Sequence, residues 1–161
     1  GMDVLMRYTL RLLTLDQRSR AAALICALEL ERQQRQGDPG SSLGDWPFEI
    51  GLWVGRAATP NRMGRKGEPD PQGVTARNKV LRYLNNTKRP MPVPIRACPW
   101  CGTEFGPASF KLTPNTEQPT NLVLRCVSRD CDFHVAKRDL PILTVDEPIY
   151  RRLPEIGRAH V

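Results

Sequence analysis

Four cysteines in two pairs are the residues whose types and spacing most clearly indicate chemistry in this sequence. Cys98 and Cys101 are separated by two residues and followed by a glycine, and Cys126 and Cys131 are separated by four. Two thiolates at either spacing can reach the same ion, and both spacings occur in structural zinc sites. Because four thiolates close a tetrahedral shell and leave no position for a substrate, we expect one structural Zn²⁺ site.

Two other interpretations of these cysteines remain open. The four residues could form two disulfides, or His134, three residues after Cys131, could replace one thiolate. The N-terminus has no basic segment leading into an apolar stretch and a cleavage site, so we expect a cytoplasmic protein with reduced cysteines. The fifth cysteine, Cys26, lies in an apolar run and is expected in the core.

The positive charge of the chain is concentrated in one segment. The whole chain carries a net charge of +7, and residues 56–96 contain ten Lys or Arg against two Asp or Glu, a local charge of +8. A localised basic segment suits a polyanion such as nucleic acid, although a solvated linker would show the same charge. No membrane partner is expected, because the longest apolar run, residues 21–28, is too short to span a bilayer.

The other residues that could do chemistry give little support for catalysis. Asp146 and Glu147 follow an apolar strand, as in a Walker B motif, but no phosphate-binding loop accompanies them. We therefore favour Asp146 as the cap of the helix that follows. The chain has only two histidines, so no nucleophile–base set is indicated and we predict no catalytic residue.

The elements that must position these residues alternate between strands and helices. Such alternation predicts an α/β fold with a doubly wound sheet, interrupted by a zinc ribbon between its second helix and third strand. We expect one α/β layer over residues 2–90, the zinc ribbon over 91–138, and a returning strand and short helix over 139–161. The predicted strands are 4–9, 48–54, 104–112, 122–125 and 140–145, and the predicted helices are 14–36, 75–85 and 147–153, with a long loop over 55–73.

Several segments resemble one family, the helicase-like subunit of the DISARM phage-defence system. These segments are VLMRYTLRLLT at 4–14, AAALICAL at 21–28, IGLWVG at 50–55 with TPN at 59–61, the two cysteine pairs, and VDEPIYRRLP at 145–154. The family belongs to the superfamily-two helicases or DNA translocases. After Ile156 the chain departs from the family pattern.

The resemblance implies an internal piece of the first RecA-like domain, beginning after the phosphate-binding loop. Residues 4–14 would correspond to motif Ia, which contacts the nucleic-acid backbone. ATP would be bound only by the full-length parent, an ATP-dependent helicase, so this chain alone is expected to have no ATPase activity. The predicted phosphate contacts are Arg7, Arg11 and Thr14 from that motif, with Arg56, Arg62, Arg65 and Lys66 from the basic segment.

The sequence thus favours a nucleic-acid-binding fragment of a helicase-like phage-defence protein, with DNA as the expected partner. A zinc-ribbon module that binds protein partners of a defence complex is one alternative, and an inactive remnant of a truncated helicase gene is another. Self-association through an exposed strand edge or apolar surface is also expected.

Overall fold

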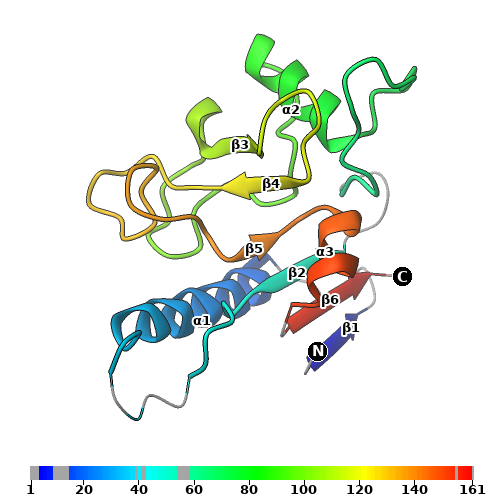
Figure 1. Cartoon of the computed structure of the whole chain (residues 1–161). Helices are drawn as coiled ribbons and strands as arrows, with labels where there is room; N and C mark the ends of the chain where they lie inside the picture. Colours follow the sequence, from blue (N-terminus) through cyan, green and yellow to red (C-terminus); the bar gives the residue numbers. More distant parts are fainter. Residues whose placement is uncertain are drawn as a thin grey trace.

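A parallel sheet and a two-stranded antiparallel ribbon organise the chain (Figure 1). The computed structural model describes residues 4–8, 15–38, 40, 43–53, 59–154 and 156–160, with side chains described between 19 and 52 and between 59 and 154. The elements are β1 (Val4–Tyr8), α1 (Leu15–Gln34), β2 (Ile50–Trp53), α2 (Ala76–Asn85), η1 (Pro107–Ser109), β3 (Phe110–Thr113), β4 (Asn121–Leu124), β5 (Ile142–Leu143), α3 (Asp146–Arg152) and β6 (Ile156–His160). The predicted α/β class is confirmed.

The larger sheet has the strand order β1-β6-β2-β5, and every pairing in it is parallel. β6 lies in the interior, where Ile156 is paired with Val4 on one side and Ile50 on the other. The sequence did not predict this strand, because the segment IGRAH has one β-branched residue and no apolar alternation. Its place is set by backbone pairing with two neighbouring strands.

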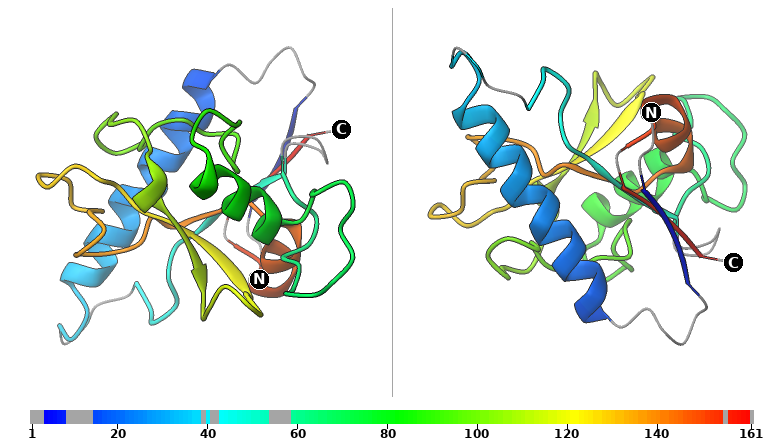
Figure 2. Two further views of the ribbon diagram at one scale, coloured as in Figure 1. Left: turned by 90° about the horizontal axis from the view of Figure 1, so that it is seen from above. Right: turned by 90° about the horizontal axis from the view of Figure 1, so that it is seen from below.

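Helices lie on both sides of the sheet, with α1 on one face and α3 on the other (Figure 2). Ile50 and Leu52 of β2 are fully buried. Between them, Gly51 lies under α3: a Cβ there would come within 2.9 Å of Pro154 Cγ and 3.1 Å of Ile149 Cγ2. The absence of a side chain at Gly51 therefore allows α3 to approach the sheet closely.

Two predicted strands differ from the observed ones. The strand expected over 104–112 begins only at Phe110, after the 3-10 turn η1, while Glu104 forms an isolated bridge with Ala97. The strand expected over 140–145 is paired in the sheet over Ile142–Leu143 alone. Leu140 bonds instead to β4, its N–H donating to the carbonyl of Leu124 at 2.8 Å, so this segment connects the ribbon to the sheet.

The ribbon and the sheet share one hydrophobic core. Buried Ile25 and Cys26 of α1, Ile50 of β2, and Phe133 and Cys131 of the cysteine module belong to the same cluster. Loss of order around the cysteines is therefore expected to reach α1. Within the described ranges, no helix is long and apolar enough to cross a membrane.

Candidate metal centre and basic loop

The four paired cysteines bring their sulfur atoms together. All four Sγ atoms lie within 4.8 Å of one another, with 3.9 Å between Cys98 and Cys131 and 3.5 Å between Cys101 and Cys126. Zn–S bonds of about 2.3 Å place the sulfurs of a tetrahedral site about 3.8 Å apart, whereas a disulfide requires about 2.05 Å. The arrangement fits one four-coordinate metal ion, and all four cysteines are free thiols.

Backbone turns place each pair of sulfurs. In the first turn Gly102 has a φ of 78°, and its N–H donates to the carbonyl of Cys98 at 2.8 Å. This left-handed conformation favours glycine, which explains the residue after the second cysteine. In the second turn, Ser128 N–H donates to Cys126 Sγ and Phe133 N–H donates to Cys131 Sγ, each at 3.4 Å. Such N–H donors stabilise thiolates and orient them for a metal.

The pKa values of the thiols indicate which of them hold their protons most tightly. Burial raises the pKa of Cys98, and it raises that of Cys131 to about 11. Although desolvation opposes the shift, hydrogen bonds with the Thr103 side chain and backbone lower the pKa of Cys101 to about 7. Because metals bind thiolates, uptake of an ion here must release protons and must depend on pH.

His134 and Trp100 lie near the four cysteines in the chain but do not belong to the candidate metal site. His134 is not one of the side chains whose ligand atoms lie within 4.8 Å of one another, and its Nδ1 accepts a hydrogen bond from the backbone N–H of Ala136 at 3.2 Å. Trp100 is 38% exposed at the tip of the first turn. It donates from Nε1 to Asp132 Oδ2 at 3.0 Å and its ring lies 6.0 Å from that of Phe133. These contacts pack Trp100 against its own module.

Three of the predicted phosphate contacts come together in the structure. Arg62, Arg65 and Lys66 line a cavity of about 630 Å³ between residues 62–68 and the start of β4. Arg62 forms an ion pair with Glu68, and Lys66 Nζ lies 2.6 Å from Glu117 Oε1. The structure leaves the other four predictions open. Arg7 belongs to β1 but its side chain is not described, and Arg11, Thr14 and Arg56 lie outside the described residues.

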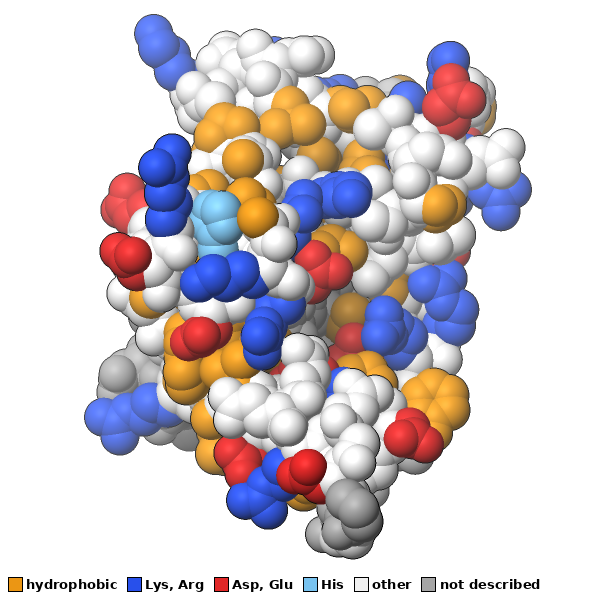
Figure 3. Space-filling model, turned by 60° about the vertical axis from the view of Figure 1, so that its left-hand side comes forward, with side chains coloured by type: hydrophobic (Ala, Val, Ile, Leu, Met, Phe, Trp, Pro, Cys, Tyr) orange, Lys and Arg blue, Asp and Glu red, His pale blue; other side chains and the backbone are white. Residues whose placement is uncertain are grey.

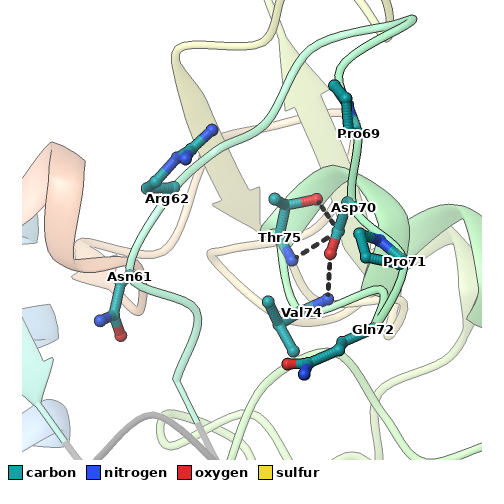
Figure 4. A pocket seen from close by; sticks show the side chains of 8 residues that line it. All are labelled: Asn61, Arg62, Pro69, Asp70, Pro71, Gln72, Val74 and Thr75. Carbon is teal, nitrogen blue, oxygen red and sulfur yellow. Dashed lines mark hydrogen bonds between the residues drawn. The ribbon is translucent and has the colours of Figure 1, made fainter.

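Asp70 fixes the loop that carries these basic residues. Its carboxylate accepts from Val74 N–H and Thr75 N–H, each at 3.0 Å, and from the Thr75 hydroxyl at 2.8 Å (Figure 4). Although partial desolvation opposes the shift, these hydrogen bonds and one from Asn78 hold the pKa of Asp70 well below its usual range. Thr75 caps α2, accepting from Asn78 N–H. Arg62 lies across this pocket from Asp70 (Figure 4).

The predicted role of Asp146 as a helix cap is wrong. The N-cap position of α3 is Val145, which makes no side-chain cap, and Asp146 is the first helical residue. Its Oδ1 is buried without a hydrogen-bond partner, and burial raises its pKa. The neighbouring carboxylate of Glu147 binds the basic loop, because its Oε2 accepts a hydrogen bond from Met63 N–H at 2.9 Å. The helix begins one residue earlier than expected, and its first N–H groups, those of Asp146 and Glu147, donate instead to the carbonyls of Pro60 and Asn61, each at 3.1 Å.

The fold and the site together define an α/β protein with a four-cysteine candidate metal centre at one end of the ribbon and a basic loop against the hairpin at its other end (Figure 1). No protein-family model matches the chain. Over 159 residues, 97% of this chain, it is 33% identical to a protein named DISARM protein DrmA from Bacillus paralicheniformis, and the match spans 13% of that relative. The chain is therefore related to one segment of a DISARM protein, which confirms this part of the resemblance seen in the sequence.

Proposed function

We propose that this chain is a zinc-stabilised nucleic-acid-binding segment of a phage-defence protein. Its similarity to DISARM protein DrmA supports the defence role. The parallel sheet with helices on both faces is compatible with the RecA-like domain of a helicase or translocase, which the sequence resemblance implies. ATP binding and hydrolysis would then belong to the larger protein, since the sequence of this chain contains no phosphate-binding loop.

In this proposal, Zn²⁺ is held by Cys98, Cys101, Cys126 and Cys131. When bound, it supplies a structural crosslink with a closed coordination shell. Backbone N–H groups of the chain orient the thiolates. The hydrophobic core shared by the ribbon and the sheet packs the cysteine module against α1. The zinc module thereby fixes the ribbon whose hairpin faces the basic loop.

The observation that carries nucleic-acid binding is the gathering of Arg62, Arg65 and Lys66 around one polar cavity. Arg65 is exposed and has no ion pair with any described residue. The Lys66–Glu117 pair is also exposed, and pairs of this kind contribute about 0–1 kcal/mol. A phosphate can therefore replace Glu117 as the partner of Lys66 at little cost.

The test compares the chain with two variants that each lose basic side chains, in a fluorescence anisotropy titration against labelled duplex DNA. Arg62→Gln/Arg65→Gln/Lys66→Gln removes the basic side chains of the cavity. Lys88→Gln/Arg89→Gln removes exposed charge after α2, within the same basic segment but outside the cavity. We expect binding by the wild type and by the control, and a loss of affinity in the triple variant. Equal losses in both variants would show attraction to net charge without a site.

A second candidate, a protein-interaction module, is favoured by one feature of α1. Leu24 is 56% exposed and Leu28, one turn later, is 37% exposed, so two apolar side chains on the outer face of this helix remain partly open to solvent. A partner or a second copy of the chain would bury these two side chains. Capture of a defence-complex protein that depends on Leu24 and Leu28, and is unaffected by the triple basic variant, would favour this candidate.

A further inference from the structure

Three arginines without a carboxylate partner among the described side chains lie along one surface. Arg65, Arg138 and Arg151 form no ion pair with any described acid. Among their neighbours, Arg62, Lys66 and Arg152 are compensated by carboxylates, and the Arg152 guanidinium lies 2.6 Å from Glu49 Oε1. An uncompensated guanidinium is the preferred protein group for binding phosphate.

Two cavities adjoin where these arginines lie. The first, of about 630 Å³, is lined by Arg65 and ends at Thr120. The second, of about 360 Å³, begins at the next residue, Asn121, and is lined by Arg138 and Arg152. Arg151 lies at the junction, because its Nη2 donates to the Thr120 carbonyl at 2.6 Å. That bond uses one of five guanidinium donors and leaves the others for a ligand.

Arg138 gives independent evidence for a ligand in the second cavity. Its Nη1 is buried and has no hydrogen-bond acceptor. The acids around the cavity are already engaged: Glu29 accepts from Arg32, Gln33 and Phe48 N–H, Glu49 pairs with Arg152, and Asp139 lies 3.8 Å from Arg125 Nε. A buried guanidinium donor without an acceptor is costly, so an acceptor supplied from outside the chain would stabilise it.

We propose that the phosphate-binding surface of this chain extends from the basic loop across Arg151 to Arg138, so that one nucleic-acid strand follows both cavities. This inference rests on the proposed function and adds two contacts that the sequence did not indicate. A strand carries one phosphate for every 3.4 Å of rise or so, which suits a row of separate guanidinium groups along a surface. Lys and Arg side chains, with some carboxylates between them, border the hollow on the face shown in Figure 3.

The experiment measures DNA affinity and thermal unfolding for the zinc-loaded chain and three variants: Arg138→Met, Arg151→Gln and, as the control, Arg89→Gln. Arg89 is exposed and lines neither cavity. We expect Arg138→Met and Arg151→Gln each to weaken binding about ten-fold or more and to reduce the salt dependence, with Arg89→Gln near wild type. Without DNA, Arg138→Met should unfold at the same or a higher temperature, because it removes an unpaired buried donor.

The outcomes separate this inference from the proposed function. If the wild type does not bind DNA, both are overturned. If the triple basic-loop variant loses binding while Arg138→Met and Arg151→Gln retain it, only the extended surface is overturned. A lower unfolding temperature for Arg138→Met without DNA would assign Arg138 a structural role. Displacement of DNA by polyglutamate as readily as by unlabelled DNA would show a site for acidic proteins and contradict the assignment.

Discussion

Replacing one of two fully buried cysteines should remove the metal, while replacing the other should not. Cys126 and Cys26 both have 0% exposure, but only Cys126 belongs to the sulfur cluster. Cys126→Ala leaves three thiolates, and structural zinc sites contribute about 10–16 kcal/mol to folding. Because a domain has a total stability of only about 5–15 kcal/mol, weakening the site should unfold the cysteine module.

Cys26→Ala is the matched control. It deletes one buried sulfur from the α1 core, where burial raises the pKa of the thiol to about 12 and keeps it protonated. The cost of such a deletion is about 1–2 kcal/mol, without loss of metal. Zinc content is measured with a chromophoric chelator after thiol modification, and stability by thermal unfolding with and without chelator.

We expect one zinc per chain for the wild type and for Cys26→Ala, and a large loss of zinc and of chelator-sensitive stability for Cys126→Ala. Full zinc occupancy in Cys126→Ala would refute the four-thiolate site. Equal loss of zinc in both variants would show that the loss follows from core damage.

Three further predictions concern the elements around the site. Glu29→Gln should destabilise the chain by about 3–5 kcal/mol in urea unfolding, because it leaves Arg32 buried without its ion pair. Although burial opposes the shift, hydrogen bonds from Arg32 and Gln33 lower the pKa of Glu29. The stability that Glu29 contributes is therefore present above the ordinary glutamate pKa of about 4.3 and is lost as the pH falls through the folded value. Asp146→Asn should raise the unfolding temperature at pH 7, since burial raises the pKa of Asp146, and the gain should vanish as the pH falls below the ordinary aspartate pKa of about 3.9. Gly51→Ala should lower the unfolding temperature by pushing α3 from the sheet, whereas Gly67→Ala, where a Cβ meets no atom within 4 Å, tests only the cost of its positive φ.

The candidate metal centre could be predicted because its chemistry is local in sequence. Each pair of cysteines lies within a single turn, and the glycine after Cys101 already indicates the backbone conformation that the structure shows. The helices were also predictable from periodicity and flanking residues. Strand β6 was not, because its place depends on backbone pairing with β1 and β2.

The charge pattern predicted the basic loop but not which of its charges are compensated. The partner of Lys66 is Glu117, 51 residues away, and Arg152 pairs with Glu49 across the fold. Arg138 and Arg151 lie outside the basic segment, so nothing in the local charge singled them out. Their significance depends on which acids are already engaged, and that is a property of the folded chain.

Nucleic-acid binding by the zinc-loaded chain is tested most directly by the salt dependence of its affinity for labelled duplex DNA. Between about 50 and 200 mM salt, each phosphate contact should contribute a slope of about −0.9 to log Kobs against log salt concentration. The three basic side chains of the loop alone predict a total slope of about −3, and the extended surface predicts a steeper one. No binding at the lower salt concentration, or an affinity that does not change with salt, would contradict the proposed function.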